Sequence, residues 1–132
     1  MTDNYLPNDY QKFIATSRYA RWLEKEGRRE TWSETVARYM KNIITPIADA
    51  STASAIEEAI LGLEVMPSMR SLMTAGPASE VDNTCMYNCS YLAVDDPKAF
   101  DEGMYILLNG TGVGFSVESQ YVTNLPEIPS QL

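Results

Sequence analysis

The chain has 132 residues, of which 45% are hydrophobic and 21% are charged, and its formal net charge is -8. This length suits one ordinary globular domain and is too short for a large multi-domain enzyme. The first 44 residues carry eight of the ten basic residues, whereas the rest of the chain carries twelve of the eighteen acidic ones. Because a strongly acidic surface repels phosphate backbones, we expect no binding to nucleic acid.

Neither a membrane segment nor a metal site is expected. No stretch approaches the roughly 20 apolar residues that a membrane helix needs, and residues 1–9 are polar, unlike a secretory signal. We therefore expect a cytoplasmic protein without membrane contact. The chain has two cysteines and no histidine, so a disulfide framework, a metal site of its own and the commonest general base are all excluded.

Three helices are expected in the first half of the chain. Apolar residues at helical spacing predict a first helix over residues 9–25. A capping box at Thr31–Glu34 opens a second helix, which Pro46 bends or ends. A second box, which begins at Ser54, opens a third helix that closes at Gly62.

The sequence pattern changes after Gly62. Residues 63–77 are typical of extended chain and loop around a short apolar segment, because proline and glycine interrupt them. We therefore place a domain boundary here, between a helical cap at residues 1–62 and a sheet-containing part at residues 63–132.

A strand, a helix and a second strand are expected in the second part. Alternating side chains predict strands over residues 87–94 and 113–118. Between them, Asp96-Pro97 begins a helix that ends at Asn109-Gly110. This connection has the length that parallel pairing requires. Since two parallel strands cannot cover both their faces and their edges, we expect polypeptide outside this sequence to complete the sheet or barrel.

Cys85 and Cys89 are the first candidates for chemistry. At ~3.3 Å per residue along a strand, their Cα atoms would lie about 13 Å apart, which is beyond disulfide reach. The residues alone favour a core position for both, because free cysteines in cytosolic chains are commonly buried. A reactive role for either cysteine is the alternative.

Two further segments could bind a ligand. The glycine-rich residues 109–116 look like a dinucleotide loop, but they follow a helix and precede a strand, which is the reverse of that motif. Their spacing favours a helix cap and a tight turn, and the alternative is that Gly112 lets a flat substrate lie against the backbone. Ser68 and Arg70 could bind an anion, although a surface loop is the commoner explanation for such a segment.

Five segments resemble, in the same order, the start of the monomeric adenosylcobalamin-dependent (class II) ribonucleotide reductases, including phage forms. The similarity runs from about residue 10 to residue 122. The segments are Ser17-Arg-Tyr-Ala-Arg-Trp-Leu, Glu26-Gly-Arg-Arg-Glu-Thr-Trp, Val65-Met-Pro-Ser-Met-Arg-Ser-Leu, Tyr87-Asn-Cys-Ser-Tyr and Asn109-Gly-Thr-Gly-Val-Gly-Phe-Ser-Val.

The resemblance implies an α/β fold, in which an amino-terminal helical cap precedes the first strand-helix-strand unit of a ten-stranded α/β barrel that this chain leaves incomplete. It implies that Cys89 is a redox-active reductant. It places Ser68 and Asn88 at the substrate, and the backbone of Thr111 and Gly112 near the nucleotide. Cys85 matches no functional position of the family.

The resemblance also implies the reaction. In the family a thiyl radical takes the 3′ hydrogen of a ribonucleotide, the 2′ hydroxyl leaves as water, and two further cysteines supply electrons as they close a redox-active disulfide. Adenosylcobalamin, with its cobalt, is the cofactor, and an external thiol such as thioredoxin is the reductant. The radical cysteine, the second reductant and the cobalamin site lie in family regions beyond residue 132, so the implied partner is the carboxy-terminal remainder, in the same gene or as a second chain.

Two other hypotheses remain beside this one. The chain could be a non-catalytic assembly or nucleotide-binding module derived from a reductase. It could also be a small independent α+β domain with its cysteines in the core. Di- and triphosphate substrates are both compatible with the resemblance.

Overall fold

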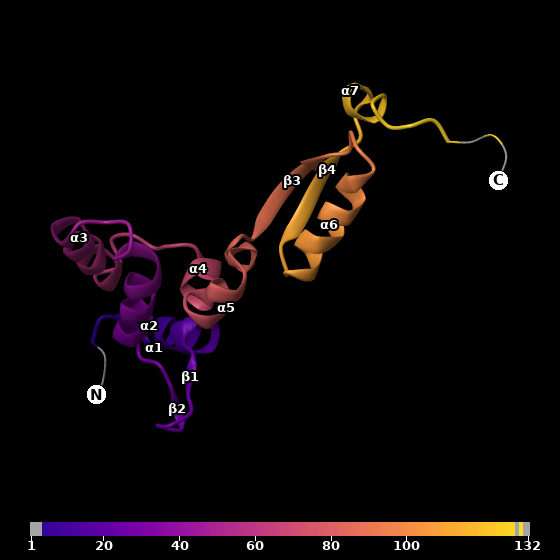
Figure 1. The fold of residues 1–132 in the computed structure, drawn as a ribbon. Helices are drawn as coiled ribbons and strands as arrows, with labels where there is room; N and C mark the ends of the chain where they lie inside the picture. The colour runs from indigo at the N-terminus through magenta and orange to yellow at the C-terminus, as the bar shows by residue number, and fades with distance from the viewer. Residues whose placement is uncertain (1–3, 129, 131–132) are drawn as a thin grey trace. The chain divides into compact units, whose positions relative to one another are not determined.

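The computed structural model describes residues 4–128 and residue 130. These residues form two compact units, Met1–Met86 and Tyr87–Leu132, and each unit is described by itself. Helices and strands of both units are labelled in Figure 1.

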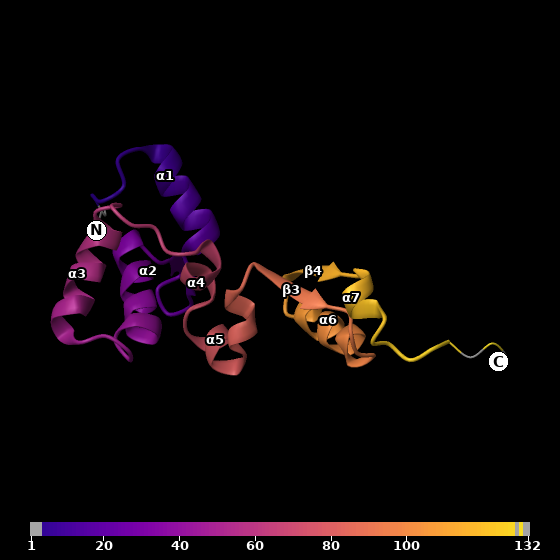
Figure 2. The same cartoon turned by 90° about the horizontal axis from the view of Figure 1, so that it is seen from above.

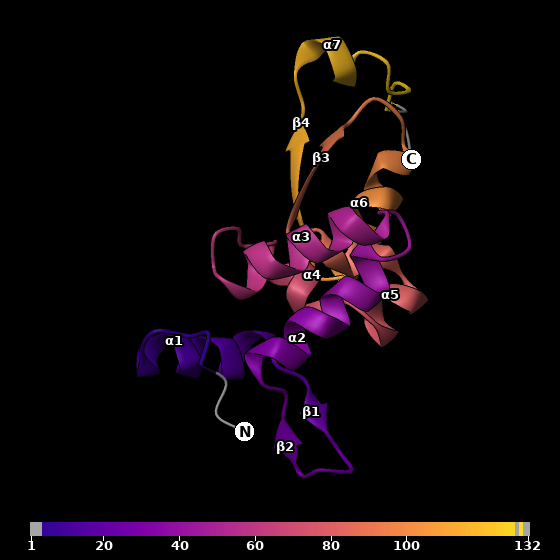
Figure 3. The same ribbon diagram turned by 90° about the vertical axis from the view of Figure 1, so that its left-hand side faces the viewer.

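The first unit is helical, with one short hairpin. Strands β1 (Trp22–Leu23) and β2 (Arg28–Arg29) pair antiparallel, and Figure 3 shows this hairpin projecting from the helices of the unit. The helical elements are α1 (Asp9–Ile14), the π-helical turn η1 (Ala15–Tyr19), α2 (Trp32–Tyr39), the π-helical turn η2 (Met40–Ile44), α3 (Ala50–Leu61), α4 (Met69–Thr74), α5 (Pro77–Val81) and the 3-10 helix η3 (Asn83–Met86).

The first helix is shorter than the predicted range 9–25. Helix α1 and turn η1 end at Tyr19, and Trp22 lies in strand β1 rather than in a last helical turn. The Glu30 N–H donates to the Arg21 carbonyl at 2.8 Å, and the Glu30 carboxylate accepts the Arg21 N–H at 2.9 Å. This pairing across the hairpin overrides the helical spacing of the apolar residues, because tertiary contacts commonly outweigh local propensity.

Helix α2 begins at the predicted capping box. The Thr31 hydroxyl accepts the Glu34 N–H at 3.3 Å, and the Glu34 carboxylate accepts the Thr31 N–H at 2.7 Å. The helical chain continues through η2 to Ile44. It therefore ends two residues before Pro46, as predicted.

The predicted start of the third helix at Ser54 is wrong. Helix α3 begins at Ala50, because the Asp49 carboxylate accepts the N–H groups of Ser51 and Thr52 at 3.0 Å and so caps the helix earlier. Its end is as predicted, since Leu61 is the last helical residue and Gly62 is the C-cap.

Residues 63–77 are not the extended chain and loop that the sequence predicts. They contain helix α4 and the start of α5, and Leu72 of α4 is completely buried in the core. Helices this short show too few periodic residues to reveal themselves in the sequence. Because α4 and α5 belong to the first unit, the compact units divide after Met86, while the boundary predicted at residue 62 remains a prediction about domains of the complete protein.

The core of the first unit lies around α2. In Figure 2, α2 lies between α3 and α4, and both helices contact it. The buried cluster consists of Ala15, Trp32, Val36, Met40, Ile60 and Leu72. The ring of Tyr19 packs edge-on against Trp32, with centroids 6.4 Å apart.

The second unit is the predicted strand, helix and strand. Strand β3 (Cys89–Ala93) pairs parallel with β4 (Gly112–Ser116), and Cys89 lies opposite Gly112. Helix α6 (Lys98–Leu108) connects the two strands and covers one face of the pair (Figure 1), and the short helix α7 (Ser119–Val122) follows β4. Before α6, the Asp96 carboxylate accepts the Lys98 N–H at 2.8 Å, which confirms its predicted role at the helix start.

The second unit leaves much apolar surface uncovered. Tyr91 of β3 and Phe115 of β4 are 64% and 67% exposed. On α6, over half of each of these side chains is exposed: Phe100, Met104, Tyr105, Leu107 and Leu108. Parallel sheets are normally covered on both faces, so this surface fits the expectation that other polypeptide completes the unit.

Within the described part of the chain, no helix combines the length and the apolar character that crossing a membrane requires.

Candidate functional site

Cys89 lies at the start of strand β3, on the face that α6 leaves open. A Cβ added to Gly103 of α6 would lie 3.7 Å from Leu92 Cδ2, so Leu92 faces the helix. Side chains alternate along a strand, so Cys89 and Tyr91 point to the opposite face. The thiol is exposed, which contradicts the core position that the residues alone favour for Cys89. Cys85 lies half-buried in η3.

Asn88 and Gly112 are the neighbours of Cys89. The Asn88 side-chain amide donates a hydrogen bond to Cys89 Sγ at 3.7 Å. The Gly112 N–H donates to the Asn88 carbonyl at 2.9 Å. An added Cβ on Gly112 would lie 3.5 Å from that carbonyl, an ordinary contact, so packing within this chain does not by itself demand glycine there.

Thr111 anchors the same end of the sheet. The whole residue is 2% exposed, and its hydroxyl donates to the Tyr87 carbonyl at 2.9 Å. The hydroxyl therefore joins the segments that lead into the two strands, and neither the side chain nor the backbone of Thr111 is open to a ligand in this structure. Together, four of the five predicted site residues gather at one end of β3 and β4: Asn88, Cys89, Thr111 and Gly112.

Ser68 is the fifth predicted residue, and it belongs to the first unit. It is the N-cap residue of α4, it is exposed, and its side chain makes no capping hydrogen bond. Its hydroxyl is thus available to a ligand.

A tyrosine on the open face was missed by the sequence reasoning. Tyr91 follows Cys89 on this face, and its hydroxyl lies near Tyr121 of α7, the helix that follows the carboxyl end of β4. The hydroxyl and the charge of Tyr91, then burial and the Glu118 carboxylate, raise the pKa of Tyr121. The alternation of β3 was the signal that could have placed Tyr91 beside Cys89.

The surroundings of the site are acidic. From Tyr87 onward, Lys98 is the one basic residue in the sequence, whereas acidic residues are frequent. Cations for a phosphate group are therefore scarce in the second unit. In the described residues there is also no group of three or more His, Cys, Asp or Glu side chains that could hold a metal ion.

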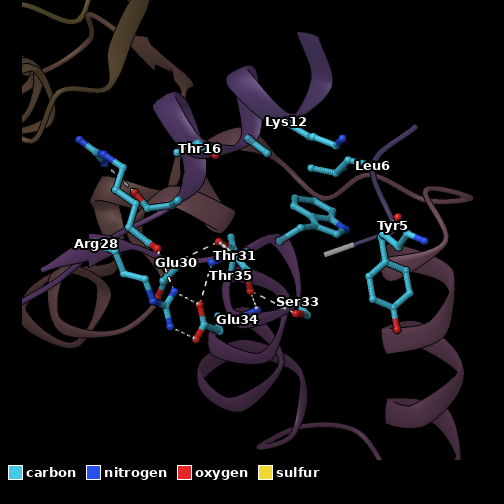
Figure 4. A pocket seen from close by; sticks show the side chains of 15 residues that line it. Tyr5, Leu6, Lys12, Thr16, Arg28, Glu30, Thr31, Ser33, Glu34 and Thr35 are labelled. Atoms are coloured by element: carbon cyan, nitrogen blue, oxygen red, sulfur yellow. Dashed lines mark hydrogen bonds and ion pairs between the residues drawn. The ribbon is translucent and has the colours of Figure 1, made fainter. Parts of the chain in front are cut away.

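A cleft of about 1210 Å³ lies in the first unit (Figure 4). Its charged groups are largely paired with each other: the Arg28 guanidinium donates to both Glu34 oxygens at 2.8 Å and also pairs with Glu26. The hydrogen bonds from Arg28 lower the pKa of Glu34 to about 2. None of the five predicted site residues lines this cleft.

Glu30 at the edge of the cleft belongs to the framework of the unit. Burial raises the pKa of its carboxyl, but the Arg38 guanidinium and the Arg21 N–H lower the pKa by more, so the net shift is downward. The carboxylate is thus held in its charged form between the hairpin and α2, which is a structural role.

Among solved proteins, the fold matches a ribonucleotide reductase of class II. A B12-dependent (class II) ribonucleotide reductase superposes with a TM-score of 0.68 over 86% of this chain and 21% of its own, at 24% identity. No protein-family model matches the chain.

Three relatives in sequence are also adenosylcobalamin-dependent ribonucleotide reductases. The adenosylcobalamin-dependent ribonucleoside-triphosphate reductase of Lactobacillus helveticus is 25% identical over 86% of this chain. That of Lactobacillus leichmannii is 29% identical over 83% of it, and that of Levilactobacillus brevis is 28% identical over 83%. These comparisons confirm the resemblance: the chain is similar to the amino-terminal region of adenosylcobalamin-dependent ribonucleotide reductases, and it spans about a fifth of their length.

Proposed function

We propose that this chain is the amino-terminal part of a cytoplasmic, adenosylcobalamin-dependent ribonucleotide reductase, and that Cys89 is one of its two reducing thiols. The observation that carries the proposal is the exposed Cys89 thiol, which lies on the open face of β3 beside the Gly112 backbone. Asn88 and Gly112, which the resemblance also assigns to the site, lie directly beside it.

The rest of the fold is proposed to come from the remainder of the reductase. Strands β3 and β4 with α6 would be the first unit of a ten-stranded α/β barrel, and further strands would pair with their free edges. The uncovered Phe115 and the apolar outer residues of α6 support this, because such surface is normally buried.

The proposed reaction removes the 2′ hydroxyl of a ribonucleotide as water. Two electrons and two protons are needed to replace the C–O bond by C–H, and the Cys89 thiol with a second thiol of the remainder supplies them as their sulfurs form a disulfide. An external dithiol such as thioredoxin then reduces that disulfide by thiol exchange. The hydrogen bond from the Asn88 amide would orient the sulfur.

The substrate is proposed to be a ribonucleoside triphosphate, as the names of the relatives indicate. Ser68 and Asn88 would contact it with their side chains and Gly112 with its backbone, while the buried Thr111 would hold this strand end near the nucleotide. Because the second unit is poor in cations, the phosphates would be bound mainly by residues of the remainder.

Adenosylcobalamin would supply the radical chemistry when bound. The residues of this chain do not fit it: a corrin ring needs a broad open surface, whereas the cleft of the first unit is lined by ion-paired side chains such as Arg28 and Glu34. We therefore assign the cofactor to the remainder. This chain alone is expected to be inactive.

Replacing Cys89 tests the proposal. In the chain assembled with the remainder of the reductase, Cys89→Ser should abolish deoxyribonucleotide formation under multiple turnover, because one of the two electron-donating thiols is lost. Cys85→Ser is the matched control and should retain activity within about twofold, since Cys85 matches no functional position of the family. The measurement is product formation with adenosylcobalamin and a dithiol, together with co-sedimentation to verify assembly. Full activity of Cys89→Ser would refute the assignment.

A second candidate function is a non-catalytic assembly or nucleotide-binding module derived from a reductase. The exposed apolar residues of α6 would suit docking on a reductase chain. It predicts that Cys89→Ser binds the remainder or a nucleotide as the unaltered chain does, and that no mixture with the remainder yields turnover.

A further inference from the structure

The open face of the second unit carries an alternating pattern of side chains and bare backbone. Cys89 lies opposite Gly112, and Tyr91 lies opposite Gly114. Both glycines are exposed, so the bare backbone of β4 lies beside the thiol and the tyrosine ring of β3. Alternate residues on one strand lie about 6.6 Å apart, so the thiol and the ring are direct neighbours on this face.

The Tyr91 ring is accessible from the open face. The residue is 64% exposed, so the faces of the ring are free to stack. Its hydroxyl lies near Tyr121 of α7 and raises the pKa of that residue. An accessible aromatic ring beside bare backbone is a typical surface for a flat heterocycle.

The negative charge of this surface favours contact with the uncharged sugar or base of a ligand over contact with a phosphate group. Glu118 is close enough to Tyr121 to raise its pKa, and the one basic residue of the second unit, Lys98, lies in α6 on the other side of the strands. A phosphate group next to Glu118 would be repelled. A sugar or a nucleobase would not.

We infer that Tyr91 is a substrate-contacting residue, whose ring packs against the sugar and base of a ribonucleotide that lies along Gly112 and Gly114. This inference rests on the proposed function, because it takes the ribose to be at Cys89. The base is attached directly to that ribose and so comes within reach of the neighbouring ring.

The test uses the chain assembled with the remainder of the reductase. Tyr91→Ala should raise the KM for the ribonucleoside triphosphate about tenfold to a hundredfold, with a smaller effect on kcat, because a stacking contact is lost. Tyr91→Phe keeps the ring and should stay within about threefold of the unaltered protein. Tyr10→Ala removes an equally exposed ring from the first unit and should change neither constant.

A second readout does not depend on turnover. Alkylation of Cys89 by iodoacetamide is followed by mass spectrometry in the assembled protein, with a ribonucleoside without phosphates or with inorganic triphosphate as the added probe. The ribonucleoside should slow alkylation in the unaltered protein and in Tyr91→Phe but not in Tyr91→Ala, while the rate without probe stays equal in all three. Inorganic triphosphate should give no difference between the variants.

The outcomes separate this inference from the proposed function. An unchanged KM and unchanged protection in Tyr91→Ala would overturn the inference, even if Cys89→Ser is inactive and the proposed function stands. Full activity of Cys89→Ser would instead overturn the proposed function. If Tyr91→Ala fails to assemble, Tyr91→Leu replaces it: a raised KM for Leu but not for Phe supports stacking, and normal constants for both refute it.

Discussion

At the residue scale, Arg38 shows how one charged side chain joins separate parts of the first unit. Its guanidinium donates to both Glu30 oxygens at 2.8 and 2.9 Å. It also donates to the carbonyls of Leu72, Ala75 and Tyr19 at 2.9, 2.8 and 3.2 Å. These groups come from α4, from η1 and from the end of the hairpin. One arginine side chain can hold them together because its planar guanidinium donates several hydrogen bonds at once.

Replacing Arg38 should therefore be costly. Arg38→Ala is expected to lower the free energy of unfolding by about 3–5 kcal/mol, because the Glu30 carboxylate, which is almost completely buried, would lose its counter-charge. Arg38→Lys should also destabilise, since an ammonium cannot make the same set of hydrogen bonds. Urea unfolding of the full chain, followed by Trp fluorescence, measures the effect. Arg18→Ala, at an exposed position, is the control and should change stability by no more than about 0.5 kcal/mol; equal losses for Arg18 and Arg38 would contradict the role of the network.

At the element scale, α6 is bounded by local signals that the sequence displays. Gly110 has a φ of +80°, the left-handed conformation that glycine adopts without a steric penalty. The turn it makes leads directly into Thr111, whose hydroxyl holds β3 and β4 together. The glycine thus positions the strand end at which the proposed site lies.

Alanine in place of Gly110 and alanine in place of Gly103 should change the stability of the second unit in opposite directions. Gly110→Ala is expected to destabilise the second unit by about 1–2 kcal/mol, because a Cβ is unfavourable at positive φ. Gly103→Ala lies inside α6, where the added Cβ would meet Leu92 at an ordinary 3.7 Å, and it should stabilise by about 0.5–1 kcal/mol through helix propensity. Amide hydrogen exchange of α6 in the full chain measures both. The same sign for both variants would show that the φ of Gly110 does not matter.

At the scale of the whole molecule, the two units differ in how fully they bury their apolar residues. The first unit has a core in which Val36 and Leu72 are completely buried. In the second unit the described buried apolar residues are small, Val94 and Ala99, and the large ones lie exposed on α6 and the strands. Burial of apolar surface is the main favourable term in folding, so the second unit depends more on added polypeptide.

We therefore expect the two units to respond differently to the remainder of the reductase. Hydrogen exchange of the chain alone should show slow exchange in α2 and fast exchange in β3 and β4, because local stability follows buried contacts. Adding the remainder should slow exchange in β3, β4 and α6 about tenfold or more, since each 1.4 kcal/mol of added stability slows opening tenfold. Exchange in α2 serves as the internal control. Strands as protected alone as α2 would contradict this, and would favour a small independent domain.

The parts of the fold that could be predicted from the sequence are those that depend on adjacent residues. The Thr31–Glu34 box, the Gly62 cap and the turn at Gly110 each depend on a few adjacent residues, and the structure has all three. The hairpin over 22–29 and helix α4 were not predicted, because Glu30 and Leu72 act through partners distant in sequence.

The features of the candidate site also divide into those set by adjacent residues and those set by residues distant in the chain. The sequence alone determined that this chain holds two strands joined by a helix, with Cys89 on the first strand and Gly112 in the turn before the second, because alternation and turn residues are local properties. Only the tertiary structure decided the register that sets Cys89 beside Gly112 and Tyr91 beside Gly114, and which face α6 leaves open. Register and covered face depend on strand pairing and on packing between residues far apart in the chain, and no window of adjacent residues contains that information.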